Sequence, residues 1–260
     1  MTGAGAGAGA PGATDASDAA PSPVGAVIFD WGGTLTPWHD VDLRQQWVEF
    51  SRGYGTLACS LHELTARILL AEDALWQRAR TTHESGRLAD LLTQVGLDPE
   101  DEATLAGLEA YETFWEPHTL TDPQVEPLWT GLRERGIRVG VLSNTIWTRD
   151  YHRGVFERDG VAHLIDADVY SSEIPWAKPH PEAFLAAARA VGVEPDRCVY
   201  VGDRSFEDVH GPQRAGMRAV WVPHSRIPVE QQVSHDAEPD AVAHELLDVL
   251  TIVDRWCGRG

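Results

Sequence analysis

Short apolar runs alternate with amphipathic segments through the second half of the chain, and this alternation restricts the fold more than any other feature of the sequence. Apolar runs of strand length lie at residues 137–142, 167–170, 198–201 and 219–222. Apolar residues at helical spacing fall at residues 125–132, 148–157, 181–191, 206–215 and 241–253. Strands that alternate with helices in this way form parallel sheets covered on both faces. We therefore predict an α/β fold built on a doubly wound parallel sheet.

An acid follows the first apolar run of the chain, residues 24–29. Asp30 comes directly after this predicted strand, and Gly32 and Gly33 then allow a tight turn in which the backbone can approach a ligand. Polar residues also follow the later runs or lie in the loops after them: Ser143, Asn144, Lys178, Asp203 and Asp208. The carboxyl ends of the strands of a doubly wound sheet converge on one crevice, so we expect these side chains to lie together.

These residue types suit phosphoryl transfer. Asp30 can act as a nucleophile and as a metal ligand, and Ser143 can donate hydrogen bonds to phosphoryl oxygens. Lys178 is the only lysine of the chain, and its compact ammonium can neutralise charge on a substrate. Asp203 and Asp208 supply the hard oxygen ligands that Mg²⁺ prefers. The metal would allow a carboxylate to approach an anionic phosphate.

No convincing strand occurs between the first run and the alternating half. Apolar residues at helical spacing predict four helices within residues 39–117, and Ser60 is the expected N-cap of the second. Residues 1–23 lack large apolar side chains and cannot offset the entropy cost of ordering, so we predict a disordered tail there. The chain then divides into that tail, an α/β core and a small helical subdomain inserted into the core.

Charge and cysteine content restrict the partners. A formal net charge of -19 disfavours binding to nucleic acid or to an anionic membrane. No apolar run approaches the length of a membrane span, and the first residues lack the pattern of a secretory signal, which favours the cytoplasm. Cys59, Cys198 and Cys257 form no CxxC pair, so we expect neither a disulfide framework nor a zinc site. We expect a monomer or a homodimer that acts on a small molecule.

Four segments carry the polar residues described above: FDWGGTLT (residues 29–36), VLSNT (141–145), SSEIPWAKPHPEAF (171–184) and YVGDRSFEDVHGPQRAGM (200–217). In order and wording they resemble the four motifs of the haloacid dehalogenase-like hydrolase superfamily. The resemblance covers nearly the whole chain from residue 24 onward. It implies a Rossmann-like core at residues 24–38 and 118–260, with residues 39–117 as the helical cap of the family.

The same resemblance implies roles for the polar residues. It implies an aspartyl-enzyme intermediate on Asp30, with the transferred group held by Ser143, Asn144 and Lys178. Mg²⁺ would be bound by Asp30, the backbone carbonyl of Gly32, Asp203 and Asp208. The expected activity is Mg²⁺-dependent hydrolysis of a small phosphorylated metabolite.

Gly32 departs from the phosphatases of this superfamily, which carry a second aspartate, the general acid, two residues after the nucleophile. Such a group contributes about 10²- to 10⁴-fold in rate, so we expect good leaving groups such as acyl or aryl phosphates to be favoured. Candidates to replace the acid are Glu207, His39, His83 and Glu84. The alternative function is a phosphate-binding or regulatory protein with little turnover.

Two other activities of the superfamily are disfavoured. Its dehalogenases work without a metal and carry a bulky residue at the position of Gly32, so Asp203 and Asp208 would have no purpose there. Its phosphonatases need a lysine from the cap, and residues 39–117 contain none. The tryptophans of the first loop and of the insert either pack the core or form an aromatic wall that selects a ring-bearing substrate: Trp31, Trp38, Trp47, Trp76 and Trp115.

Overall fold

Six parallel strands form one sheet in the computed structural model, which describes residues 23–55, 60–223, 233 and 235–259. The strands are β1 (Ala26–Phe29), β2 (Arg138–Ser143), β3 (Ala167–Tyr170), β4 (Cys198–Gly202), β5 (Arg218–Trp221) and β6 (Ala241–Val242). Their order across the sheet is β3-β2-β1-β4-β5-β6, and every neighbouring pair is parallel. The sheet confirms the predicted α/β fold. Residues 1–22 of the predicted tail, and Cys59, lie outside the described residues.

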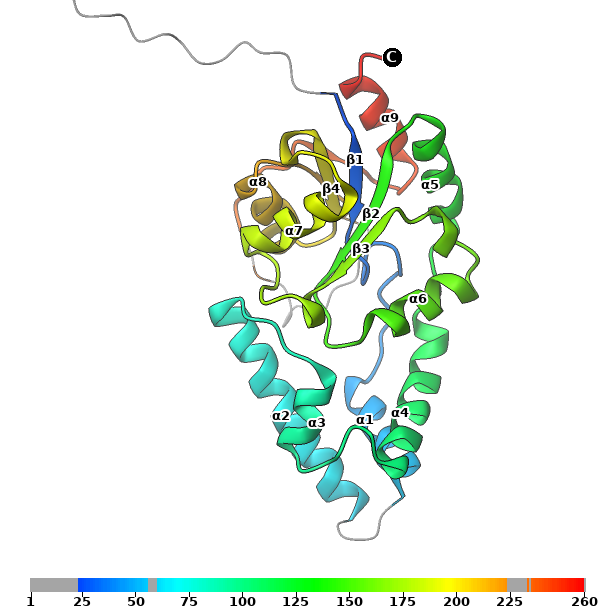
Figure 1. Ribbon diagram of the computed structural model, residues 1–260, viewed down its shortest axis with the longest axis vertical. Coiled ribbons are helices and arrows are strands. Elements are labelled where there is room, and N and C mark those ends of the chain that lie inside the picture. Colours follow the sequence, from blue (N-terminus) through cyan, green and yellow to red (C-terminus); the bar gives the residue numbers. More distant parts are fainter. Residues whose placement is uncertain (1–22, 56–59, 224–232, 234, 260) are drawn as a thin grey trace, which may run out of the picture.

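Helices cover both faces of the sheet (Figure 1). They are α5 (Val125–Glu134), α6 (Arg149–Arg158), α7 (Pro181–Val191), α8 (Gly211–Arg214) and α9 (Asp248–Trp256). Successive residues of a strand point to opposite faces. In β1, Val27 and Phe29 therefore enter the apolar cluster shared with α5, α6 and α9, whereas Ile28 enters the cluster shared with α7. Both clusters are buried, as the near-continuous apolar runs of the strands predict.

The helix predicted at residues 241–253 is wrong in its first half. Ala241–Val242 form β6, and α9 begins only at Asp248. Without β6, the outer edge of β5 would leave backbone polar groups unpaired. Instead the backbone N–H of Asp240 donates to the carbonyl of Ala219 at 2.9 Å, and that of Ala243 donates to the carbonyl of Trp221 at 2.9 Å. The hydrogen bonds to the edge of β5 stabilise a strand here more than the helical spacing of the apolar residues stabilises a helix.

The insert contains the four predicted helices: α1 (Leu43–Tyr54), α2 (Leu61–Thr82), α3 (Leu88–Gln94) and α4 (Glu102–Trp115). Ser60 is the N-cap of α2 as predicted, and its hydroxyl accepts a hydrogen bond from the backbone N–H of Glu63 at 3.2 Å. These helices, called the helical group below, enclose their own apolar cluster around Trp47 and Ile68. Ile146, which follows the carboxyl end of β2, joins that cluster, so the helical group lies at the carboxyl edge of the sheet (Figure 1). Among the described residues, no helix combines the length and apolar character that a bilayer crossing needs.

Candidate active site

The polar residues predicted at the strand ends meet where the strand order reverses. β1 lies between β2 and β4, and the chain visits β2 and β3 on one side before it returns to β4 on the other. Phe29 of β1 pairs with Val201 of β4, and the backbone N–H of Asp30 donates to the carbonyl of Val201 at 2.9 Å. Asp30, Ser143 and Asp203 therefore stand at the carboxyl ends of three adjacent strands, the edge where open α/β sheets bind ligands.

Lys178 lies at the centre of the site and is buried, with 5% of its surface exposed. Its Nζ donates to Asp30 Oδ1 at 2.6 Å, to Asp208 Oδ1 at 2.7 Å and to the hydroxyl oxygen of Tyr200 at 2.8 Å. The Tyr200 hydroxyl in turn donates to the carbonyl of Leu142 at 2.9 Å. An ammonium has three N–H donors, so these contacts fix both the position and the direction of the Lys178 side chain.

Burial and charge shift the pKa values of this group in a way that keeps Lys178 charged. Burial raises the pKa of Asp30, and the nearby Lys178 ammonium opposes that rise. Burial alone would lower the pKa of Lys178, but the carboxylates of Asp208 and Asp30 outweigh it and raise that pKa. A cation held between two carboxylates is desolvated at a cost, which the three short hydrogen bonds offset.

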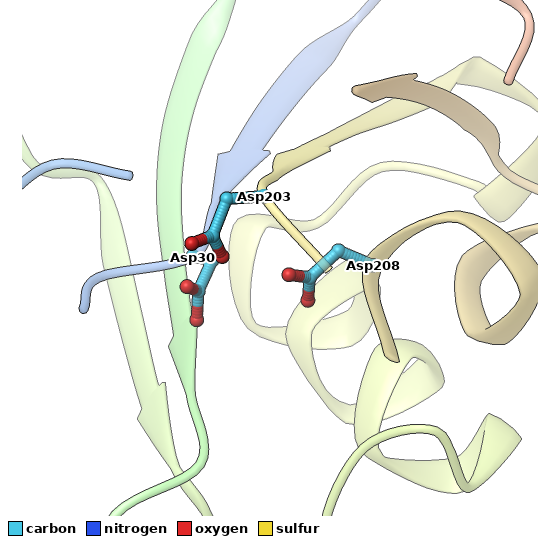
Figure 2. A group of neighbouring side chains, drawn as sticks. All are labelled: Asp30, Asp203 and Asp208. Carbon is cyan, nitrogen blue, oxygen red and sulfur yellow. The ribbon is translucent and has the colours of Figure 1, made fainter. Parts of the chain in front are cut away.

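Asp30, Asp203 and Asp208 form a group that suits a divalent metal ion. Each offers one carboxylate oxygen, and these oxygens lie within 4.8 Å of one another. Figure 2 shows the three carboxylates turned toward a common space, two from the ends of β1 and β4 and the third from the π-helical turn Ser205–His210. The backbone N–H of Arg204 donates to Asp208 Oδ2 at 3.0 Å and holds that carboxylate in place. Three hard oxygen donors fit Mg²⁺, and their negative charge exceeds the single charge of Lys178.

Two glycines make this close approach possible. Gly33 has φ +92°, a backbone conformation that residues with a side chain rarely adopt. A Cβ there would also collide with the carboxylate of Asp203 and the indole nitrogen of Trp38. A Cβ on Gly202 would collide with the side chain of Asp208. Small residues at these two positions let both acids approach the loop that carries Asp30.

Asn144 holds the backbone of Lys178. Its Nδ2 donates to the carbonyl of Lys178 at 2.9 Å, and the backbone N–H of Lys178 donates to its Oδ1 at 2.8 Å. This pair of bonds ties the loop after β2 to the loop that carries the lysine. Asn144 also lines the cavity described below, and its predicted contact with a substrate stays a prediction.

A cavity of about 750 Å³ extends from the carboxylates to the helical group. Its wall at the sheet edge includes Asp30, Gly32, Ser143 and Lys178. Its opposite wall is formed by side chains of α1, α2 and α4. Asp30, Gly32, Ser143, Asn144 and Lys178 therefore share one cavity with the helical group, large enough for a small organic substrate, whereas Asp203 and Asp208 do not line it.

Comparison with known proteins identifies the family. The family model described as haloacid dehalogenase-like hydrolase matches residues 24–216, about three quarters of the chain. The chain belongs to the haloacid dehalogenase-like hydrolases.

Relatives of this haloacid dehalogenase-like hydrolase carry phosphatase names. A glyceraldehyde 3-phosphate phosphatase of Methanopyrus kandleri is 34% identical over 163 residues, which cover 62% of this chain and 69% of the relative. A phosphatase of Mycobacterium tuberculosis is 35% identical over 210 residues, 78% of this chain and 88% of the relative. A phosphoserine phosphatase of Thermus thermophilus is 34% identical over 114 residues, 44% of this chain, and the alignment spans only 45% of that relative.

Solved structures of the same family share the fold. A haloacid dehalogenase-like phosphatase from Thermococcus onnurineus matches with a TM-score of 0.61 and 23% identity, over 88% of this chain and 98% of that one. A 2-haloacid dehalogenase from Pseudomonas syringae pv. Tomato matches with the same TM-score of 0.61 and the same 23% identity, over 90% and 99%. The fold is therefore common to both activities and does not distinguish them.

Gly32 leaves open space in this haloacid dehalogenase-like hydrolase. A Cβ built there meets no atom within 4 Å, and Gly32 lines the cavity. Of the four side chains considered as replacements for the general acid, Glu207, His39 and His83 line the cavity and Glu84 does not. Burial raises the pKa of Glu207, and its Oε2 has no hydrogen-bond partner among the described residues.

Two residues of the site escaped sequence reasoning. Tyr200 lies between two valines of β4, so the strand pattern assigns it to the core and gives no sign of its bond to Lys178. Glu72 lines the cavity from α2, on the helix face that carries Ile68 and Leu75. A carboxylate on an apolar helix face is a detectable signal, because a buried acid needs a partner.

Proposed function

We propose that the protein hydrolyses a small phosphorylated metabolite with Mg²⁺, through an aspartyl-phosphate intermediate on Asp30. The observation that carries this proposal is the convergence of three carboxylates within 4.8 Å of one another, beside an ammonium 2.6 Å from Asp30. The phosphatase names of the relatives support a phosphate ester over a haloacid as the substrate. The metal ligands would be Asp30, the carbonyl of Gly32, Asp203 and Asp208, and the bound ion would neutralise phosphoryl charge.

In the proposed mechanism an oxygen of Asp30 attacks phosphorus, and the bond from phosphorus to the ester oxygen breaks. Ser143 donates a hydrogen bond to the phosphoryl group, and Lys178 balances the charge on it. Water then attacks the acyl phosphate, releases inorganic phosphate and a proton, and restores the Asp30 carboxylate. Tyr200 and Asn144 touch Lys178, from its side chain and its backbone, and act as positioning residues.

The first step has no aspartate at Gly32 to protonate the departing oxygen. Without that proton, esters of weakly basic alcohols react readily, whereas alkyl phosphates react slowly. Acyl and aryl phosphates are therefore the expected good substrates. Glu207, His39 and His83 remain candidate acids for other esters, because all three line the cavity.

The helical group is proposed to be the cap that selects the substrate. In this division residues 39–117 form the cap, and residues 24–38 and 118–260 form the catalytic core. A cytoplasmic location, a monomeric or homodimeric state and the absence of nucleic-acid partners stay predictions.

A panel of acetyl phosphate, an aryl phosphate and sugar phosphates tests the proposal. We expect phosphate release from the good leaving groups that needs Mg²⁺, stops with a chelator and is lost in Asp30→Asn. Asp73→Asn, an exposed residue of α2, is the matched control and should keep the activity. Activity that survives Asp30→Asn would refute the assignment of the nucleophile.

A second function is favoured by Gly32 itself: a phosphate-binding or regulatory protein that kept the pocket and lost turnover. Binding without turnover stabilises the folded state in proportion to ligand concentration. A raised melting temperature with phosphate esters, together with no release of phosphate from any of them, would support this second function over the first.

A further inference from the structure

Part of the cavity wall is lined by four aromatic rings together with one carboxylate, and we call this part the aromatic cage. We define the cage by its residues, which come from α1, α2, α4 and the loop after β2: Gln46, Glu72, Trp76, Tyr111, Trp115 and Trp147. The rings of Trp115 and Trp147 meet edge to face with centroids 5.4 Å apart. Those of Tyr111 and Trp147 do the same at 6.1 Å. Four rings thus line the same cavity as this acid.

Hydrogen bonds within the protein fix the rings of the cage. The indole N–H of Trp115 donates to Gln46 Oε1 at 2.9 Å, and that of Trp147 donates to the hydroxyl of Tyr111 at 2.8 Å. These polar atoms are already used, so the rings offer a ligand mainly their π surfaces. A preorganised aromatic surface loses little entropy when it binds a ligand.

Glu72 has donors but no cation. Trp47 lies behind the cage and donates its indole N–H to Glu72 Oε2 at 2.7 Å. Among the described residues, no ion pair of Glu72 is found. Burial raises the pKa of Glu72, and hydrogen bonds from Trp47, Trp76 and Gln46 oppose that rise. The carboxylate is partly buried, so it is incompletely hydrated while it has these donors but no ion pair. A cation in the cage would supply that ion pair.

The charge of Glu72 itself favours a cation over a second anion here. Asp40, Asp42 and Arg80 also line the cavity, but all three are exposed to solvent, where their charges are screened. Glu72 is less exposed than these three residues and lies in the wall that carries the rings. Aromatic faces attract ammonium groups, and the attraction grows when water is excluded. Charge and ring chemistry therefore select the same kind of ligand.

We propose that the cage binds an organic ammonium group, so that the substrate is a phosphate ester with a positively charged nitrogen at its far end. This inference rests on the proposed function for the phosphate end of the substrate only. The aromatic wall would then recognise a charged nitrogen of the substrate, and not the ring that the sequence suggested.

Two matched series of phosphonates test the cage without any need for turnover. One is a series of ω-aminoalkyl phosphonates of increasing chain length, and the other is the n-alkyl series in which a methyl group replaces the ammonium. Calorimetry in the presence of Mg²⁺ gives both dissociation constants. At the best chain length we expect the ammonium probe to bind at least about tenfold more tightly than its methyl partner.

Variants then assign the preference to Glu72. Glu72→Gln removes the charge but keeps an oxygen that can accept the Trp47 N–H, so the fold should persist; its melting temperature checks this. We expect this variant to lose most of the preference for ammonium. Glu63→Gln, an exposed acid at the start of the same helix, is the control and should keep the preference. If Glu72→Gln fails to fold, the ratio of the dissociation constants of the methyl and ammonium probes for the unaltered protein still tests the cage.

The outcomes separate this inference from the proposed function. Equal affinities for the two series, or a preference that Glu72→Gln leaves intact, would overturn the cage assignment even if an aryl phosphate is hydrolysed. Tight, Glu72-dependent binding of the ammonium series without hydrolysis of any phosphate ester would support the cage and count against the proposed activity.

Discussion

Gly32→Asp is the substitution whose effect can be worked out most fully from the structure. The backbone at Gly32 is not among the positive-φ glycines, and an added Cβ meets no atom within 4 Å. The Cβ of the new side chain therefore meets no steric obstacle, and Gly32 lines the cavity into which the carboxyl group can extend. Replacing a glycine at a compatible position also reduces the freedom of the unfolded chain and stabilises a protein by about 0.4 to 1 kcal/mol. The variant should fold.

The expected gain is in the step that breaks the ester bond. A positioned general acid contributes about 10²- to 10⁴-fold, which is about 3 to 6 kcal/mol of barrier. The gain should be large for sugar phosphates, whose leaving oxygens need a proton. It should be small for an aryl phosphate, whose leaving oxygen does not.

The assay compares kcat/KM for a sugar phosphate and an aryl phosphate in three proteins: wild type, Gly32→Asp and Gly32→Asn. Asparagine has the same shape and backbone but no transferable proton at neutral pH, so it is the matched control. A rise for the sugar phosphate in Gly32→Asp alone is the predicted result. No rise in a folded Gly32→Asp, or an equal rise in Gly32→Asn, would refute the argument that Gly32 lacks only the acid.

Three further predictions concern the scaffold of the site. Tyr200→Phe removes a hydrogen bond to the charged Lys178, worth about 1.5 to 3 kcal/mol, so kcat/KM should fall about tenfold to a hundredfold while Mg²⁺ affinity is unchanged. Gly33→Ala forces a side chain at φ +92° into Asp203, and urea titration should show loss of stability together with weaker Mg²⁺ binding. Burial raises the pKa of Asp168, but the hydrogen bond and charge of Arg153, with Arg149, outweigh it and lower that pKa. The stability from this acid is present above its unfolded pKa of about 3.9 and is lost as the pH falls through the lower folded pKa, so Asp168→Asn should be less stable than wild type at neutral pH and approach it in acid.

Local pattern predicted the sheet and the place of its polar residues, because both depend on short-range chemistry. A strand that ends at an acid puts that acid at the sheet edge, and this holds for Asp30 and Asp203 wherever the rest of the chain goes. The sequence did not reveal β6, because the demand for pairing comes from the exposed edge of β5. Tertiary pairing there overrides a local helical pattern.

The sequence offered Trp76 and Trp115 as part of an aromatic wall, but the side chains that complete this wall could not be predicted, because they depend on how separate helices pack. Gln46, Glu72 and Tyr111 come from three helices and meet only in the folded structure. Tyr200 shows the same limit at the sheet edge: its partner Lys178 is 22 residues away in sequence and 2.8 Å away in space. Residues whose role is to hold another residue leave little trace in a single sequence.

The covalent intermediate on Asp30 is the central claim, and rapid-quench mass spectrometry during hydrolysis of an aryl phosphate tests it most directly. The account predicts one phosphoryl group on the peptide that contains Asp30, formed only with Mg²⁺ and absent in Asp30→Asn. Steady hydrolysis with no phosphoryl-enzyme, or with the phosphoryl group on any other residue, would contradict it.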